Sequence, residues 1–361
     1  MSVMELIKPS YYDEFHCIAS ACRDSCCIGW EIDIDRESLE RYKQVDGPLG
    51  ERLRRAVTED GCFRLTGEEE RCPFLNGEGL CDLILELGEA SLCEICREHP
   101  RYYEWYGSLR KEAGIGLCCE AAARLILKGG SLKRTALETP EPGDEVDREL
   151  FSLLDGVRDR MLAVLAEERL SLEEKEREIC LMAEETQRAV DEGWRWDEME
   201  SGPAAGAEVP RPELSWTERL CRELLTVLSR LEPMDPAWPG QLAAMEGRLP
   251  ELLAAVPEFL SRHPQREREY ANLLSYFLFR HFLKAAFDGE ALPRALAALA
   301  GGQGGCLRDV FLWLTKGSFS FEDGVESARR YSKELEYCEE NLEALECWCG
   351  ERWNGHYETN E

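Results

Sequence analysis

Residues 15–30 read FHCIASACRDSCCIGW and carry four cysteines, Cys17, Cys22, Cys26 and Cys27, within eleven positions. A short turn brings sulfurs that lie four or five residues apart to the same side, so thiolates at this spacing can converge on one metal centre. Cysteines that only pack in a core are not clustered in this way. The stretch therefore predicts a part of the fold that metal coordination holds together, with inert buried cysteines as the alternative.

A second group of cysteines follows downstream. Cys72 and Cys81 flank a turn signal, NGEG at 76–79, that favours a short hairpin. Cys93-x2-Cys96 is a bidentate clip of the kind that zinc and iron–sulfur sites share. These residues extend the predicted metal site.

A cysteine doublet at 118–119 precedes segment 121–127, whose apolar spacing is helical. A thiol there would lie at a helix N-terminus, where the dipole lowers its pKa. The expected metal ligands are Cys17, Cys22, Cys26, Cys27, Cys72, Cys81, Cys93, Cys96 and Cys118.

The number and spacing of the thiols indicate which metal they bind. The eight ligands before Cys118 could form two four-thiolate sites, or one such site with spare thiols. Structural zinc usually takes two C-x2-C pairs, and this region has one, so the irregular spacing favours an iron–sulfur cluster of the 4Fe–4S type, with zinc as the alternative. The run C-x4-C-x3-C differs by one residue from the plant-type ferredoxin spacing, and the doublet Cys26–Cys27 departs from the C-x3-C-x2-C triplet of ordinary radical-SAM enzymes.

The whole chain has 361 residues, 44% of them hydrophobic, and a net charge of −29. This length is typical of two domains. So negative a surface repels phosphate backbones and anionic lipids, which argues against binding to nucleic acid or membranes and favours a basic partner. No apolar run approaches a membrane span and the first residues lack a signal peptide, so we expect a cytoplasmic location, where stable disulfides are rare. The sequence leaves the oligomeric state open.

The expected fold class is mainly α, with a loop-rich, cysteine-rich metal- or cluster-binding module at 1–135 packed on a larger all-helical domain at 145–361. In the module, alternation predicts a short strand at 30–34, and a helix is expected after Asp35. In the helical domain, Ser171-x2-Glu174 forms a capping-box pattern. Three prolines predict an exposed loop at about 201–213, and apolar spacing predicts helices at about 214–231, 240–256, 265–288, 290–300, 305–316 and 321–348.

These motifs carry a family resemblance. The pattern F-x-C-x4-C-x3-CC-x2-W, followed by CPFL, LC and C-x2-C-x3-PR, resembles the flagellin lysine-N-methylase family and, more loosely, a wider group with a cysteine-rich zinc- or iron-chelating module. The stretches at 269–280 and 331–341 are similar to two polar and aromatic segments of that family. The resemblance implies methyl transfer from S-adenosylmethionine (SAM) to lysine amino groups of flagellin, in a protein that holds an iron–sulfur cluster.

Seven residues are candidates for substrate binding, and no catalytic residue is assigned. Asn272, Tyr276 and Arg280 recur every four residues on one stripe of an otherwise apolar helix. A buried guanidinium needs a partner, so we expect Arg280 to meet a carboxylate at the wall of a pocket, with Glu336 as first choice. A structural ion pair without a pocket is the alternative. The full set is Trp30, Arg101, Asn272, Tyr276, Arg280, Glu336 and Asn341.

No credible glycine-rich fingerprint of a Rossmann-type methyltransferase is present, since neither glycine-rich stretch, at 87–89 or 301–305, follows a β-branched strand. If SAM is used, the cluster or the helical domain must help to bind it. Two rival functions stay open: a non-enzymatic chelating or cluster-carrying protein whose helical half binds a partner, and a zinc-stapled module beside a binding domain.

Overall fold

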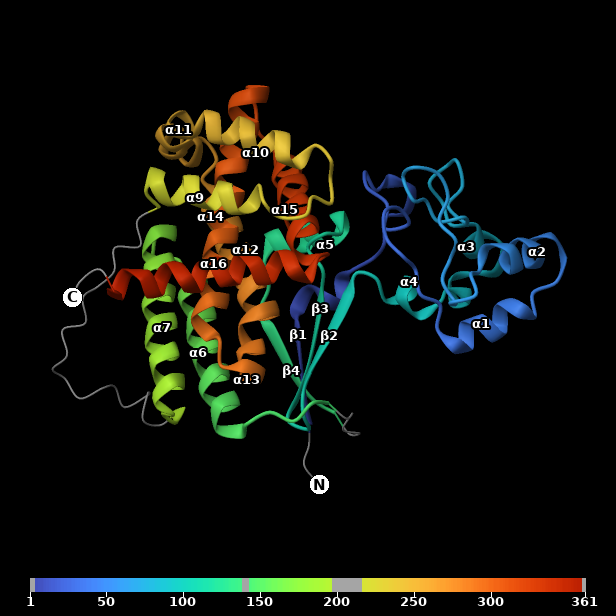
Figure 1. The fold of residues 1–361 in the computed structure, drawn as a ribbon, viewed down its shortest axis with the longest axis horizontal. Coiled ribbons are helices and arrows are strands. Elements are labelled where there is room, and N and C mark those ends of the chain that lie inside the picture. Colours follow the sequence, from blue (N-terminus) through green and yellow to red (C-terminus); the bar gives the residue numbers. More distant parts are fainter. Residues whose placement is uncertain (1–3, 138–142, 197–215, 359–361) are drawn as a thin grey trace.

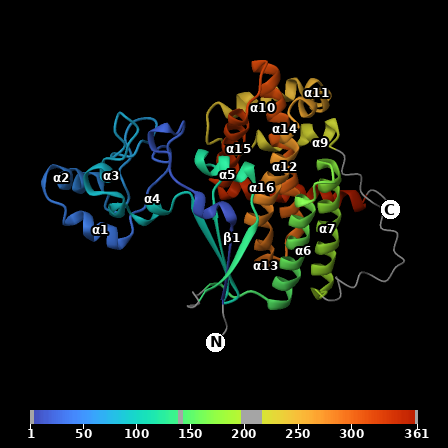
Figure 2. The ribbon, with the colours of Figure 1, turned by 180° about the vertical axis from the view of Figure 1, so that it is seen from behind.

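The computed structural model of the protein describes residues 4–137, 143–196 and 216–358, with 353–358 described as backbone only. Figure 1 shows two parts: a cysteine-rich lobe, here residues 16–100, stands to one side of a larger body of long helices and a small sheet. The view from behind in Figure 2 shows the same separation. The mainly α architecture, with a cysteine-rich N-terminal region, is confirmed.

The cysteine lobe has short helices and a small apolar core of its own. Its packing centres on Ile32, Tyr42, Leu53, Phe63 and Phe74. Its helices are α1 (Arg36–Lys43), α2 (Gly47–Ala56), α3 (Asp82–Leu87) and α4 (Glu94–Glu98).

Two local predictions in the lobe are borne out, the helix after Asp35 and the turn at 76–79. Asp35 is the N-cap of α1 and accepts a hydrogen bond from the Ser38 amide at 2.8 Å. Leu75 and Cys81 pair across the 76–79 turn as one isolated bridge, which gives the expected hairpin in its shortest form. The prediction of a strand at 30–34 is wrong. That segment makes only an isolated bridge between Asp33 and Cys62, because no neighbouring extended segment continues the ladder.

The body contains a four-stranded sheet that the sequence analysis did not predict. Its order is β2-β3-β1-β4, with β1 parallel to β3 and antiparallel to β4. One face packs against α6, where the buried guanidinium of Arg158 donates to Glu112 on β3 at 2.8 Å. Charged residues on the buried face hide the usual alternation, so the strands lack a clear sequence pattern. The strands are β1 (Met4–Pro9), β2 (Arg101–Tyr106), β3 (Arg110–Ile115) and β4 (Leu132–Leu137).

The strands show that range 1–135 contributes to two hydrophobic cores. Tyr11, Tyr106 and Ile115 belong to the core of the body, whereas Ile32 and Phe74 belong to that of the lobe. The helices of the body are α5 (Glu120–Lys128), α6 (Arg148–Ala166), α7 (Leu172–Glu192), α9 (Glu218–Leu228), α10 (Trp238–Gly247), α11 (Leu249–Arg262), α12 (Gln265–His281), α13 (Ala285–Asp288), α14 (Ala291–Lys316), α15 (Phe321–Glu336) and α16 (Glu339–Glu358).

Several helix bounds differ from the expected ones, although the predicted capping box at Ser171 and Glu174 is present. The helix expected at 240–256 is two helices that meet at Arg248, because a proline at position 250 lacks an amide hydrogen and suits a first turn. The helix expected at 265–288 ends at His281 and continues as a 3-10 turn and α13. The helix expected at 321–348 breaks between α15 and α16. The loop expected at 201–213 lies outside the described residues.

Helix α14 corrects the expectation of two helices, at 290–300 and 305–316. It runs unbroken through the glycine-rich segment 301–305. A Cβ atom at Gly301 would lie 2.9 Å from the Phe277 ring, and one at Gly302 would lie 2.9 Å from Leu274. The glycines therefore allow α12 and α14 to approach each other closely, and they do not end a helix. Among the described helices, none is long and apolar enough to cross a membrane.

Candidate metal centre

A cavity of about 370 Å³ lies between the cysteine lobe and the body. From the lobe side it is lined by the two cysteine groups, and from the body side by the start of α5 and the end of α15. Cysteine is the residue type that lines it most often. The nine cysteines that line it are Cys17, Cys22, Cys26, Cys27, Cys72, Cys81, Cys96, Cys118 and Cys119. We call it the cysteine cavity.

Eight of the nine cysteines expected as metal ligands therefore line one cavity. The ninth, Cys93, is fully buried in the lobe core and is paired with Cys96 through a thiol–thiol hydrogen bond. Cys119, the N-cap of α5, lines the cavity and was not among the expected ligands, although the doublet in the sequence pointed to it.

The thiols are arranged as two hydrogen-bonded pairs with further thiols nearby. The hydrogen bond from Cys26 stabilises the Cys27 thiolate and lowers the pKa of Cys27 to about 7. The bond from Cys96 likewise lowers the pKa of Cys93 to about 7. The thiolate is the form of cysteine that binds metals. All of these cysteines are free thiols.

The chemistry of these donors fits a thiophilic metal centre. Soft thiolates select zinc and iron–sulfur clusters over hard cations. Within the described residues, however, no three His, Cys, Asp or Glu side chains are arranged as they would be around a metal ion. Binding would therefore require the thiol pairs to draw closer together.

Ion pairs hold the first cysteine segment against the body. The carboxylate of Asp24 lies 2.5 Å from Arg329 and 3.1 Å from Lys333, both on α15. Burial would raise the pKa of Asp24, but these two cations outweigh burial and the pKa lies below its usual value. The neighbouring Arg23 donates its amide to Glu120 on α5 at 2.9 Å. These three contacts position Cys22 and Cys26 at the cavity.

Behind the body-side wall, Arg280 and Glu336 form the ion pair that the sequence predicted, with Nε and Oε1 3.1 Å apart. The Tyr276 hydroxyl lies 3.1 Å from both carboxylate oxygens of Glu336 and accepts a hydrogen bond from the Leu117 amide, next to Cys118. Burial opposes the charge of Glu336, yet Arg280 prevails and lowers the pKa of this carboxyl to about 2. The network supports the backbone from which Cys118 reaches the cavity.

The other substrate-binding candidates separate into two groups. Trp30 and Arg101 line the cysteine cavity. The Arg101 guanidinium lies over the rings of Phe15 and Tyr12, at 5.3 and 5.6 Å from their centroids, and no carboxylate of the described residues lies within ion-pair distance of it.

Asn272 and Asn341 lie elsewhere and bind backbone carbonyls. Asn272 donates to Leu127 at the end of α5 at 2.8 Å. Asn341 donates to the carbonyls of Glu232 and Glu334, both at 2.8 Å, at the break between α15 and α16. Their contacts are those of structural residues. Lys333 and Tyr337 line the cavity and were missed, although both fall in the stretch at 331–341.

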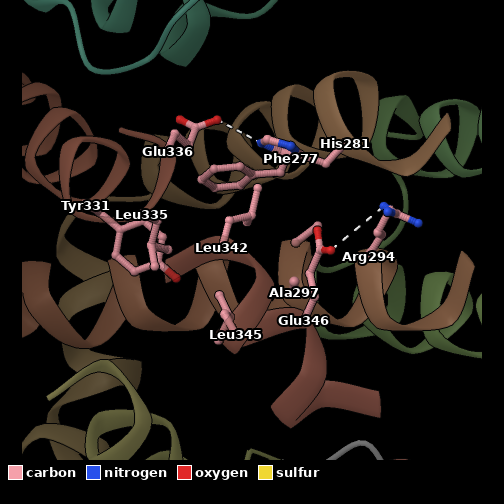
Figure 3. Close-up of a pocket in the computed structure, with 11 residues that line it drawn as sticks. Phe277, His281, Arg294, Ala297, Tyr331, Leu335, Glu336, Leu342, Leu345 and Glu346 are labelled. Atoms are coloured by element: carbon pink, nitrogen blue, oxygen red, sulfur yellow. Dashed lines mark hydrogen bonds and ion pairs between the residues drawn. The ribbon is translucent and has the colours of Figure 1, made fainter. Parts of the chain in front are cut away.

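A second, much smaller cavity lies among α12, α14, α15 and α16 (Figure 3). Figure 3 shows His281 facing Glu336 and Arg294 facing Glu346 at its edge, with apolar side chains between them. Its volume of about 10 Å³ suits a single water molecule. It is too small for a methyl donor or a lysine side chain.

Comparison with known proteins gives a partial similarity. No protein-family model matches the chain, and no solved structure matches it. Over 139 residues the chain is 26% identical to the lysine-N-methylase of Salmonella typhimurium. The aligned segment covers 35% of this chain and 33% of that protein. It is 25% identical over 139 residues to the flagellar biosynthetic protein FliU of Salmonella muenchen, of which the match covers 79%. The matched segment thus spans about a third of the methylase, and it links about a third of this chain to a lysine methylase and a flagellar biosynthetic protein.

Proposed function

We propose that this protein is a SAM-dependent protein-lysine N-methyltransferase, that flagellin is its substrate, and that it works in the cytoplasm. We further propose that the cysteines of the cysteine cavity hold an iron–sulfur cluster. One observation carries the proposal: nine thiols, two arginines and a tryptophan line a single cavity between two parts of the chain. The names of the two similar Salmonella proteins supply the reaction and the flagellar partner.

The reaction is a displacement at carbon. The lone pair of a neutral lysine amine attacks the methyl carbon of the sulfonium, the carbon–sulfur bond breaks with its electron pair left on sulfur, and the product ammonium then gives up a proton. Such a reaction needs the two partners held in line and water kept out. The cavity between the two parts of the chain gives both partners a shared site, which serves the first need.

The side chains of the cavity have matching chemistry. Arg101 offers a guanidinium held by aromatic rings, and we assign it to the carboxylate of the methyl donor. Trp30, whose ring centroid lies 5.8 Å from that of His99, presents an aromatic wall beside Cys26 and suits a cationic sulfonium or amine. An iron with an open coordination position, when bound, would supply a site that chelates the amino and carboxylate groups of SAM.

A second function is favoured by the cavity alone. Its thiols suit a metal- or cluster-carrying protein whose body binds a partner, with either iron–sulfur or zinc as cargo. This alternative needs no methyl donor.

The two functions separate in one experiment. The full chain is prepared anaerobically, its iron, sulfide and zinc are measured, and it is co-expressed with a flagellin. We expect iron and sulfide in the protein and mass increments of single methyl groups on flagellin lysines. A cluster-loaded protein that leaves flagellin unmodified with SAM present would contradict the methyltransferase and support the carrier. Stoichiometric zinc without iron or sulfide would contradict the cluster.

A further inference from the structure

The rim of the cysteine cavity carries an exposed apolar edge. Four large apolar side chains of the described residues are strongly exposed, and three of them, Ile84, Leu85 and Leu87, lie on the short helix α3, at 42%, 59% and 41%. Only Leu83 of this helix is buried in the lobe core. Exposed aliphatic side chains next to one another are costly in water and mark interaction surfaces.

Two of these side chains belong to the cavity itself. Ile84 and Leu85 line it, together with the acidic Glu89, whereas Leu87 does not. Glu86 and Glu89 are exposed in the same stretch, so the edge combines aliphatic contacts with negative charge. An aliphatic and acidic surface is complementary to a polypeptide that carries aliphatic and basic residues.

We propose that Ile84 and Leu85 are the docking edge for the aliphatic residues that flank the methylated lysine in an extended polypeptide substrate. This proposal rests on the proposed function. A lysine has a four-carbon stem, so an amine that reaches into the cavity leaves its backbone at the rim. Residues next to that lysine then lie over α3, and contact with Ile84 and Leu85 removes their exposed surface from water.

The test uses direct binding as well as methylation. Two fluorescent synthetic peptides carry a central lysine, one flanked by leucines and one flanked by serines, and their affinities for the metal-loaded full chain are measured by anisotropy. The wild type should bind the leucine peptide on the order of tenfold more tightly, as expected for the burial of one aliphatic side chain. Leu85→Glu should abolish that preference. Leu87→Glu, on the same helix and similarly exposed but outside the cavity lining, is the matched control and should retain it.

Methylation then gives a second readout. With an intact protein substrate, Leu85→Glu should raise KM on the order of tenfold with kcat unchanged, since only uniform binding is lost. A wild type that binds both peptides equally, or a Leu85→Glu variant that keeps the preference, overturns the docking edge even if methylation is seen. If the wild type prefers the leucine peptide but methylates no substrate, the proposed function is overturned, and Ile84 and Leu85 remain a docking edge for a polypeptide. If Leu85→Glu instead converts a dimer into a monomer in sedimentation, a second copy of the chain covers this edge and the peptide proposal is wrong. Leu85→Ser repeats each measurement without an added charge.

Discussion

Arg280 on α12 and Glu336 at the end of α15 form an ion pair with Nε and Oε1 3.1 Å apart, in which the side chain of Glu336 is 3% exposed and that of Arg280 is 19% exposed. Arg280 also donates through Nη1 to the Tyr276 hydroxyl at 2.5 Å, and its guanidinium lies 4.4 Å from the centroid of the Tyr102 ring. The pair therefore joins two helices and the sheet directly behind the body-side wall of the cysteine cavity. Arg280 does not itself line that cavity.

The ion pair predicts strong coupling between its two members. Glu336→Gln leaves the largely buried guanidinium of Arg280 without its counter-ion and should lower the free energy of unfolding by about 3 kcal/mol. Arg280→Met should cost a comparable amount, and the double variant should cost less than the sum of the two single variants. Urea unfolding of the four proteins measures this cycle. Additive effects would show that the pair contributes no coupling.

The same carboxyl predicts a pH dependence of stability. The pKa of Glu336 is lowered from 4.5 to about 2 in the folded protein, so the unfolded state binds the proton more readily. Its contribution, on the order of 3 kcal/mol, is fully present above about pH 4.5 and is lost as the pH falls toward 2. The stability difference between the wild type and Glu336→Gln should therefore shrink over this range. A difference that stays constant down to pH 3 would contradict this.

Removing a cavity cysteine predicts loss of metal. Cys96→Ala breaks the thiol pair with Cys93 and should remove most of the bound iron and sulfide in anaerobic preparations. Because metal binding to such a lobe is also folding energy, amide exchange in residues 16–100 should accelerate. Cys180→Ala, a buried cysteine on α7 outside the cavity, is the control and should keep its metal. Equal metal content in both variants would remove Cys96 from the ligand set.

The ion pairs of Asp24 between the lobe and the body predict a loss of stability when its charge is removed. Asp24→Asn removes the charge that faces Arg329 and Lys333, and Arg329 is only 5% exposed. The expected loss is about 2 kcal/mol, together with faster amide exchange in residues 16–30. Asp13→Asn removes the exposed pair with Lys8 and should change stability by less than about 1 kcal/mol. Equal effects of the two substitutions would mean that Asp24 does not hold the lobe.

Much of the candidate site could be predicted because its signals are local. The pair Cys26–Cys27 and the clip Cys93-x2-Cys96 are visible as spacings along the chain, and both form hydrogen-bonded thiol pairs in the structure. The partner of Arg280 was predictable for a different reason. A guanidinium on an apolar helix requires a carboxylate as its partner. The second polar and aromatic segment, 331–341, supplied Glu336 as the candidate.

The contacts of Asn272 and Asn341 could not be predicted from the sequence. Both stand beside aromatic and polar residues that suggest a pocket, but each binds backbone carbonyls that the sequence cannot place near it. Lys333 and Tyr337 were missed because only the fold turns the end of α15 toward the cavity.

The sequence by itself determined the features that depend on neighbours along the chain: the cysteine spacings, the helix after Asp35, the capping box at Ser171 and the helical character of the described residues beyond 145. Only the tertiary structure decided the sheet, in which β1 pairs with β3 and β4 across a long stretch of chain, and the unbroken course of α14 through its glycines. It also decided that two cysteine groups and the start of α5 line one cavity. The physical reason is that caps and periodicities are satisfied within a few residues, whereas strand pairing, close helix packing and a shared cavity depend on residues that meet only when the chain folds.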